Sequence, residues 1–233
     1  MSVTPIAALH YQAAAQPKGV ALIEGDDSWT YERLAGCAKR LARGFLECGI
    51  RRGDRIVLHM PNSADLAAAY YACFHIGAIA VPLSNGLKAA DLKSLLQRLE
   101  PALYVGHVAH YNQVGAIAAS LLPLQRRFMT DSTREDTRAQ PWENLLGDGP
   151  ASVPVMYDVH SPAALFATSE TTGIPKFVIH THTTLAATVD SWEHFGLDGD
   201  QTAMISSPLV HFAGFATLAA GIRFGAVVVL LEG

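Results

Sequence analysis

A long apolar stretch over residues 66–83 constrains the fold most strongly, because it approaches the length of a membrane-spanning helix. It is apolar except for His75, and Gly77 interrupts it. The stretch therefore predicts a buried helix over Ala64–Ile76, followed by a short strand over Ala78–Pro82. A helix of this kind belongs to a layered core and not to a bilayer.

A second apolar stretch, over residues 213–231, divides in the same way. Gly225 separates a helical segment from an apolar strand over residues 227–231. Both stretches favour a soluble protein that folds around a large core.

Short apolar runs and helical patterns alternate along the rest of the chain. Residues 32–48 carry apolar side chains at helical spacing, and a strand pattern follows over residues 55–60. This alternation is typical of an α/β fold with mostly parallel sheets flanked by helices. We expect a first α/β sheet unit over residues 1–130, a connector over 131–158, and the start of a second unit over 159–233.

The composition excludes several classes of protein. Hydrophobic residues make up 50% of the chain, which excludes wholesale disorder. Seventeen basic residues against 21 acidic ones disfavour a broad nucleic-acid-binding face. Cys37, Cys48 and Cys73 form no close pair, so they predict free thiols in a reducing, cytoplasmic setting. With no signal peptide or cysteine–histidine zinc spacing, we expect neither secretion nor a metal site in this chain.

The segment over residues 168–176 carries the most chemical information. It places four hydroxyl residues, Gly173 and Lys176 between two apolar runs. Hydroxyl groups and loop amides donate hydrogen bonds to phosphate oxygens, and a lysine adds a mobile positive charge. The spacing matches neither the Walker loop nor the dinucleotide-binding glycine pattern. Composition alone leaves an ordinary surface turn open as an alternative to a polyphosphate site.

The same segment resembles the phosphate-binding signature of the AMP-forming acyl-CoA synthetase superfamily, which includes luciferases and peptide-synthetase adenylation domains. That signature reads Thr/Ser-Ser/Gly-Gly-Thr/Ser-Thr-Gly-x-Pro-Lys-Gly. The matching positions are Thr168, Ser169, Thr171, Thr172, Gly173, Pro175 and Lys176. Four further segments are similar to signatures of the superfamily in the expected order: Trp29–Leu34, Gly53–Ser63, Gly77–Leu83 and Pro208–Gly214.

Two positions depart from the superfamily pattern. Glu170 stands where glycine or serine is usual, and its carboxylate would repel phosphates unless it points away or meets a cation. Phe177 replaces the glycine that usually follows the lysine. Glu170 is therefore a possible perturbation of ATP binding.

The resemblance implies an ATP-dependent ligase. Such enzymes, with Mg²⁺, convert a carboxylate and ATP to an acyl adenylate and pyrophosphate, and then transfer the acyl group to coenzyme A. By resemblance, the ATP phosphates would be held by Thr168, Ser169, Thr171, Thr172, Gly173 and Lys176. His211 would border the acyl pocket, with an ordinary half-buried histidine as the alternative. His180 and His182 are interpreted as a structural pair.

Several later elements of the superfamily have no match in this chain, among them the adenine, ribose and hinge segments. No catalytic residue is therefore assigned here. We expect an N-terminal fragment that is inactive alone, with an open apolar edge at the strand 227–231 that permits self-association. Two alternatives stay open: a non-catalytic homologue that binds a partner chain, and the N-terminal part of a peptide-synthetase adenylation domain. The sequence does not identify the carboxylic acid.

Overall fold

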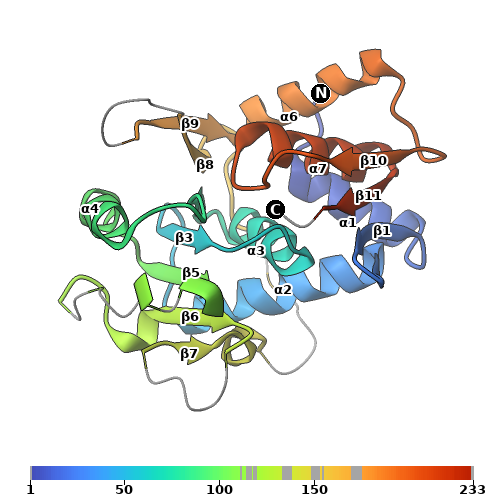
Figure 1. Ribbon diagram of the computed structural model, residues 1–233. Coiled ribbons are helices and arrows are strands. Elements are labelled where there is room, and N and C mark those ends of the chain that lie inside the picture. Colours follow the sequence, from blue (N-terminus) through green and yellow to red (C-terminus); the bar gives the residue numbers. More distant parts are fainter. Residues whose placement is uncertain are drawn as a thin grey trace.

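The computed structural model describes residues 2–110, 112–113, 117, 120–132, 138–147, 153, 155–168 and 175–231. Two sheets with helices between and around them make up the fold (Figure 1). Most neighbouring strands are parallel, so the expected α/β class is confirmed.

The larger sheet has seven strands in the order β7-β6-β5-β3-β4-β8-β9. Its neighbouring strands run parallel, except that β8 and β9 form an antiparallel pair. The bounds are β3 Arg55–His59, β4 Ile79–Pro82, β5 Leu103–His107, β6 Arg127–Thr130, β7 Gln140–Pro141, β8 Pro162–Ala167 and β9 Phe177–Thr181.

The smaller sheet has four strands in the order β10-β11-β1-β2. The strands β10, β11 and β1 run parallel, and β2 returns antiparallel to β1. The bounds are β1 Val20–Glu24, β2 Asp27–Thr30, β10 Thr202–Ile205 and β11 Val227–Leu230.

Six α-helices cover these sheets within the described part of the chain. Their bounds are α1 Pro5–Ala15, α2 Tyr31–Glu47, α3 Ala64–Ile76, α4 Ala89–Leu99, α6 His182–Asp190 and α7 Phe212–Phe224. None of these helices has the length and apolar character that crossing a membrane requires.

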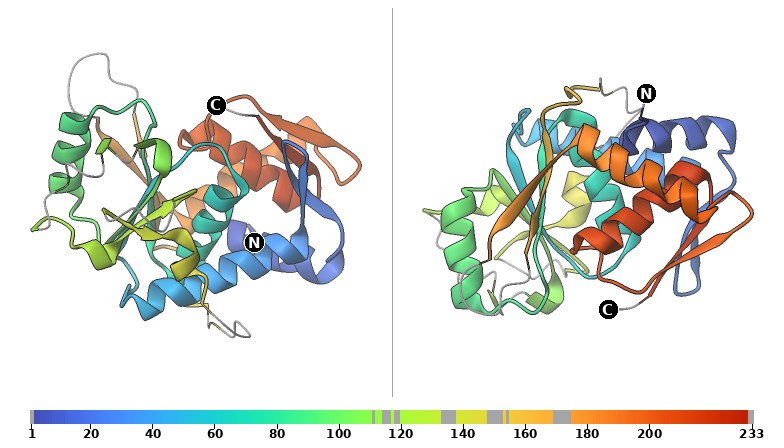
Figure 2. Two further views of the ribbon diagram at one scale, coloured as in Figure 1. Left: turned by 60° about the horizontal axis from the view of Figure 1, so that its bottom comes forward. Right: turned by 90° about the horizontal axis from the view of Figure 1, so that it is seen from above.

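The helix α3 occupies the space between the two sheets (Figures 1 and 2). Ser63 caps its start by accepting a hydrogen bond from the backbone N–H of Leu66 at 3.1 Å, and Gly77 ends it in a left-handed conformation. Every residue of α3 except Asp65 is buried. The apolar stretch at residues 66–83 is therefore a core helix and a strand, as predicted.

The larger sheet separates two hydrophobic clusters. Side chains of a strand alternate between its faces, so Ile56 and Leu58 join the cluster around α3, while Val57 joins the cluster under α4. The α4 side of the sheet is closed by Leu92 and Leu95, among others. Both faces of the larger sheet are buried, which explains why a strand such as β3 is apolar at consecutive positions.

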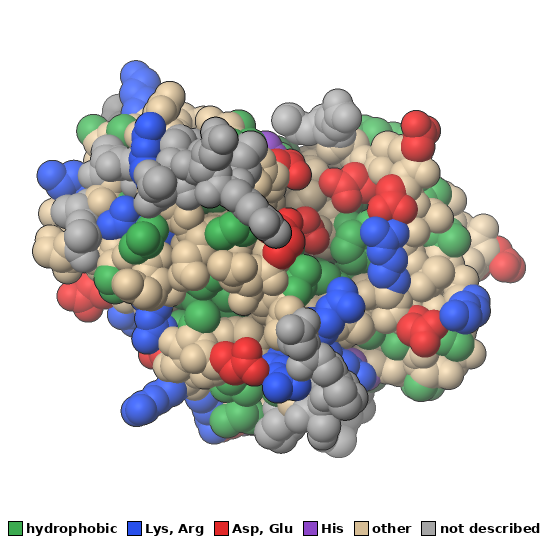
Figure 3. Space-filling model, turned by 90° about the horizontal axis from the view of Figure 1, so that it is seen from below, with side chains coloured by type: hydrophobic (Ala, Val, Ile, Leu, Met, Phe, Trp, Pro, Cys, Tyr) green, Lys and Arg blue, Asp and Glu red, His purple; other side chains and the backbone are tan. Residues whose placement is uncertain are grey.

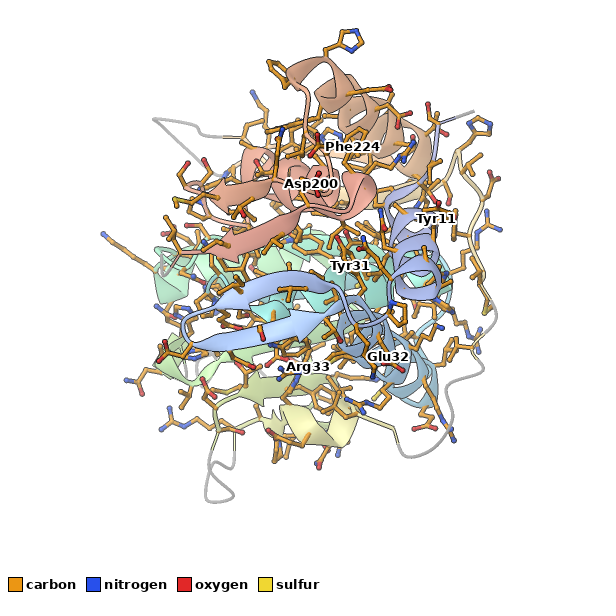
Figure 4. All side chains as sticks on the ribbon, turned by 90° about the vertical axis from the view of Figure 1, so that its right-hand side faces the viewer. Tyr11, Tyr31, Glu32, Arg33, Asp200 and Phe224 are labelled. Atoms are coloured by element: carbon orange, nitrogen blue, oxygen red, sulfur yellow. The ribbon has the colours of Figure 1, made fainter. Side chains whose placement is uncertain are left out.

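The segment before α2 fastens that helix to the smaller sheet. Thr30 accepts a hydrogen bond from the backbone N–H of Arg33 at 3.1 Å and so caps α2. The hydroxyl of Tyr31, a residue labelled in Figure 4, donates to the carbonyl oxygen of Ala226 at 3.1 Å. Thr30 and Tyr31 of the segment Trp29–Leu34 thus serve capping and packing.

Strand pairing crosses the unit boundaries expected from the sequence. The strands β1 and β2 lie within residues 1–130 but pair with β11, whereas β8 and β9 lie within residues 159–233 but extend the larger sheet. Each sheet therefore draws strands from both sides of the expected connector. The division at residues 131–158 stays a prediction about folding units and does not separate the sheets.

The last strand does not form the open edge that the sequence suggested. β11 lies between β10 and β1, because its backbone groups pair on both sides. Apolar exposure lies instead on the outer strands: Ile179 of β9 is 62% exposed, and Met204 of β10 is 61% exposed. The prediction that residues 227–231 form an open sheet edge is therefore wrong.

Candidate active site

The candidate phosphate-binding loop connects β8 and β9. These strands pair in register up to Ala167 and Phe177, so the loop closes an antiparallel hairpin. The backbone N–H of Thr168 donates to the carbonyl oxygen of Lys176 at 2.9 Å, which fixes the two ends of the loop. Five predicted loop residues lie outside the described residues: Ser169, Glu170, Thr171, Thr172 and Gly173.

Two neighbours support the second end of this loop. The guanidinium of Arg98, on α4, donates to the carbonyl oxygen of Pro175 at 3.3 Å. Phe177 packs against the hydrophobic cluster beneath α4. The bulky residue that departs from the superfamily pattern therefore anchors the start of β9 on the sheet.

His211 lies on a turn between β10 and α7. It is the N-terminal cap residue of α7 and is exposed. Its backbone N–H donates to the carbonyl oxygen of Pro208 at 2.9 Å, and its own carbonyl oxygen accepts from Phe215 at 3.1 Å. The turn thus leads directly into the helix.

A cavity of about 210 Å³ lies beside His211. Most of its wall comes from the carboxyl ends of β3 and β4 and from the turn before α7. The lining residues are Asn62, Ser84, Asn85, Gly86, Pro208, Val210 and His211. Ligands of α/β sheets bind at the carboxyl ends of the strands, so this position suits a substrate.

A larger cavity of about 470 Å³ was not foreseen from the sequence. Three carboxylates and a histidine line it: Glu24 ends β1, Asp65 lies in the first turn of α3, Asp131 follows β6 and His107 ends β5. Figure 3 shows acidic side chains gathered around a hollow on this face. Among the described residues, no group of acidic, histidine or cysteine side chains is arranged to hold a metal ion.

The environment of this cavity disfavours the ionised form of the Asp65 carboxyl group. Burial, followed by the negative charges of Glu24 and Asp131, raises the pKa of Asp65 to about 6. Glu24 accepts a hydrogen bond from the backbone N–H of Ala64 at 3.0 Å, which brings its charge to the start of α3. The sequence signal that could have predicted this cavity is the position of Glu24 and Asp131 at strand ends, with Asp65 in the first turn of a helix.

Four histidines to which the sequence assigns no role, His59, His75, His107 and His110, have specific partners. Three of them lie together at the carboxyl ends of β3 and β5. His59 contacts the hydroxyl of Tyr104 at 2.8 Å and stacks on His110 at 4.2 Å. The Nε2 atom of His110 donates to the Oδ1 atom of Asn85 at 3.1 Å. The Nε2 atom of His107 lies 2.8 Å from the Oδ2 atom of Asp131.

The remaining histidine, His75, makes a buried contact with a backbone carbonyl. Its Nε2 atom lies 2.7 Å from the carbonyl oxygen of Val153. Because a carbonyl oxygen can only accept, the Nε2–H group of His75 donates this hydrogen bond. Burial lowers the pKa of His75.

His180 and His182 contribute to packing. The ring of His180 stacks on Phe212 at 4.2 Å, and burial lowers its pKa. His182 is fully buried and stacks on Tyr157 at 4.1 Å. These contacts support the interpretation of the two histidines as a structural pair.

Comparison with known proteins identifies the family. Residues 9–233 match the family described as "AMP-binding enzyme". The chain belongs to the AMP-binding enzyme family. The resemblance seen in the five sequence segments is therefore confirmed over nearly the whole chain.

Curated relatives of this AMP-binding chain include ligases and a peptide synthetase. "Protein Y" of Streptomyces griseus is 29% identical over 228 residues, covering 92% of this chain and 72% of that protein. The probable non-canonical nonribosomal peptide synthetase CymA of Salinispora arenicola is 32% identical over 222 residues, covering 94% of this chain and 3% of that protein. The long-chain-fatty-acid–CoA ligase FadD13 of Mycobacterium tuberculosis is 28% identical, covering 90% of this chain and 41% of that enzyme.

Solved structures agree on the fold of this AMP-binding chain. The anthranilate CoA ligase AuaEII in complex with anthranoyl-AMP has a TM-score of 0.92 at 19% identity, covering 100% of this chain and 45% of that one. Apo MbtA of Mycobacterium smegmatis has a TM-score of 0.89 at 25% identity, covering 100% of this chain and 44% of that one. The chain thus spans less than half the length of FadD13 and of both structures.

Proposed function

We propose that this chain is the N-terminal portion of an AMP-forming acid–CoA ligase. In the complete enzyme, a carboxylate attacks the α-phosphate of ATP and releases pyrophosphate. The thiol of coenzyme A then takes the acyl group from the acyl adenylate and releases AMP. Support comes from the family match, the relatives named as CoA ligases and the hairpin loop whose ends meet at Thr168 and Lys176.

The loop residues would hold the β- and γ-phosphates of ATP. Hydroxyl and amide groups would donate hydrogen bonds to the phosphate oxygens, and the ammonium of Lys176 would offset their charge. The residues proposed for this role are Thr168, Ser169, Thr171, Thr172, Gly173 and Lys176. The closed base of the hairpin supports it, because it returns Lys176 to the side of Thr168.

Mg²⁺ is proposed only as the counter-ion of ATP. The carboxylates Glu24, Asp65 and Asp131 do not form a metal-binding group among the described residues. Asp131 follows β6, and three strands (β5, β3 and β4) separate β6 from β8 in the sheet order. These acids therefore do not fit a metal at the phosphate loop, and no ligand of Mg²⁺ is assigned to this chain.

His211 is proposed to border the acyl pocket near the substrate carboxylate. Its exposure and its place beside a cavity of about 210 Å³ at the strand ends support this role. The thiol acceptor is proposed to be coenzyme A. The similarity to the peptide synthetase CymA favours a carrier-protein thiol as the second candidate.

ATP binding is the direct test of the phosphate loop. We expect millimolar ATP with Mg²⁺ to shift the backbone amide resonances of Thr168 and Lys176 in the ¹⁵N-labelled chain. Lys176→Ala should weaken this response about tenfold, because a charge-assisted hydrogen bond is lost. Lys93→Ala, which removes an exposed lysine of α4, is the matched control and should leave the response unchanged. Equal responses from both variants would exclude Lys176 from the phosphate site.

Glu170 offers a second test of the same loop. If its carboxylate faces the phosphates, Glu170→Gly will strengthen ATP binding, because a like charge is removed. Unchanged affinity in this variant would show that Glu170 points away from the ligand.

We further propose that the 233-residue chain alone does not turn over a carboxylic acid. It spans 41% of FadD13, and the superfamily segments for adenine and ribose have no match in its sequence. Incubation with ATP, coenzyme A and a panel of acids should yield no acyl-CoA by mass spectrometry. Any catalytic turnover by the purified chain would contradict this proposal.

We also propose a cytoplasmic location, which three free cysteines and the need for ATP support. Self-association is proposed through the outer strands β9 and β10, where Ile179 and Met204 are exposed. Light scattering should show a concentration-dependent rise in mass that Ile179→Lys suppresses. A monomer at all concentrations would exclude this contact.

A further inference from the structure

The side chain of Asn62 connects three segments that are distant in the sequence. It follows β3 at the carboxyl end of the larger sheet. Its Oδ1 atom accepts a hydrogen bond from the backbone N–H of Leu209 at 2.7 Å, and its Nδ2 atom donates to the carbonyl oxygen of Leu231 at 3.1 Å. One carboxamide thus joins the larger sheet to the turn before α7 and to the end of β11.

The peptide groups of Leu209 are held from both sides. Asn62 binds its N–H, and the buried hydroxyl of Tyr70 on α3 donates to its carbonyl oxygen at 2.8 Å. The Leu209 side chain is fully buried. Such a residue has little freedom to move relative to β3 and α3.

This fixed residue lies two positions before His211. The backbone N–H of His211 donates to Pro208, so the turn is closed immediately around Leu209. Asn62 and His211 also line the same cavity. Fixing Leu209 against β3 therefore fixes where the exposed imidazole of His211 stands at that cavity.

We propose that Asn62 is a positioning residue that sets the location of His211 at the acyl pocket. This inference rests on the proposed function of His211. Asn62 acts through Leu209. It holds the turn that follows β10 of the smaller sheet against the cavity wall that the larger sheet forms.

The chemistry of the site explains why an asparagine suits this role. One partner is a donor and the other is an acceptor, and a carboxamide offers both functions at once. An aspartate could still accept from Leu209 but could not donate to Leu231. An alanine could do neither, and would leave the N–H of Leu209 without its partner.

Two variants of Asn62 separate these contributions. We expect Asn62→Ala to speed hydrogen exchange of the Leu209 amide about tenfold more than exchange of the β3 amides. The ¹H–¹³C cross-peak of the His211 ring should move at the same time. Asn62→Asp should retain slow exchange at Leu209, because its carboxylate still accepts the hydrogen bond.

Thr30→Ala is the control for a general loss of stability. It removes the cap of α2, which accepts from Arg33, and leaves the turn before α7 untouched. We expect it to leave the His211 cross-peak in place. If Asn62→Ala changes Leu209 exchange only in proportion to global stability, or leaves the His211 cross-peak unmoved, the positioning role is excluded.

A carboxylate probe distinguishes this inference from the proposed function. Sodium octanoate is titrated into the wild-type chain while the His211 cross-peak is followed. A response supports the acyl pocket, and we expect Asn62→Ala to weaken it. If the wild type does not respond but Asn62→Ala still displaces His211, the acyl-pocket proposal fails while the positioning of His211 by Asn62 stands.

Discussion

The imidazole of His180 stacks face to face on the ring of Phe212, with centroids 4.2 Å apart and ring planes inclined by 15°. His180 belongs to β9, which leaves the candidate phosphate loop, and Phe212 begins α7 directly after His211. The contact therefore joins the two parts of the proposed site.

Removing this contact should destabilise the fold. We expect Phe212→Ala to lower the free energy of unfolding by about 2 kcal/mol, since it also loses the edge contact with Phe166. Urea denaturation measures the change. Phe195→Ala is the matched control, because Phe195 is 78% exposed, and its effect should stay within about 0.5 kcal/mol. Comparable losses from both variants would deny the stack a special role.

The turn before α7 should not tolerate a side chain at Gly214. A β-carbon there would lie 2.4 Å from the carbonyl oxygen of Pro208 and 2.6 Å from that of Ser207. We expect Gly214→Ala to cost about 1–3 kcal/mol of stability, because the backbone must shift. Gly36→Ala in α2 meets nothing within 4 Å and should instead stabilise the chain by up to about 1 kcal/mol. The unfolding temperatures of the two variants test this expectation. If Gly214→Ala is stabilising, the turn can shift to accommodate a β-carbon at little cost.

His182 should make the chain less stable in acid. Burial lowers its pKa to about 4, whereas an unfolded histidine keeps a pKa near 6.5. Between these values the unfolded state binds more protons, so stability falls as the pH drops from about 6.5 towards 4. The difference corresponds to at most about 3 kcal/mol for this residue.

His182→Phe isolates this effect. Phenylalanine can still pack against Tyr157 and Phe74, and the ring nitrogens of His182 have no hydrogen-bond partner in the described structure. Urea denaturation at several pH values should show a flatter dependence between pH 4 and 6.5. Replacing the exposed His194 by glutamine should leave the wild-type slope. An unchanged slope in His182→Phe would assign the acid sensitivity to other groups.

The effect of Asp65 on the pH dependence of stability should be opposite to that of His182. Because burial and neighbouring carboxylates raise its pKa to about 6, the folded state binds more protons than the unfolded state between about pH 4 and 6. This contribution to stability is present at low pH and is lost as the pH rises through 6. Asp65→Asn should therefore stabilise the chain at pH 7 by about 1–2 kcal/mol.

Asp91→Asn provides the matched comparison. Asp91 also lies in the first turn of a helix, but it is exposed on α4. We expect it to cost a few tenths of a kcal/mol through the lost helix-dipole interaction. If the two substitutions change the free energy of unfolding at pH 7 equally, the acidic cavity does not destabilise the ionised form of Asp65.

Local elements could be predicted well from the sequence because their signals are local. The bounds of α3 follow from Ser63 and Gly77, and the loop at 168–176 follows from its hydroxyl residues between two apolar runs. The strand pairs were harder. No periodicity in the chain reveals that β8 and β9 run antiparallel, or that β1 pairs with β11.

The site was predictable only where a motif marked it. His211 and the loop residues were found by resemblance, but Asn62 was noticed as part of a motif without a role. Its hydrogen bonds reach Leu209 and Leu231, which are distant in the sequence. The cavity of Glu24, Asp65 and Asp131 forms from three separate strand and helix ends, so its charge becomes visible only in the folded chain.

The pairing of β1 with β11 also has a consequence for biosynthesis. Leu22 emerges from the ribosome about 200 residues before its partner Val228, a delay of roughly 10–40 s at ordinary elongation rates. Throughout that interval the hairpin of β1 and β2 has an unpaired side. Newly made chains should therefore be prime clients for ribosome-associated chaperones until β11 has left the exit tunnel.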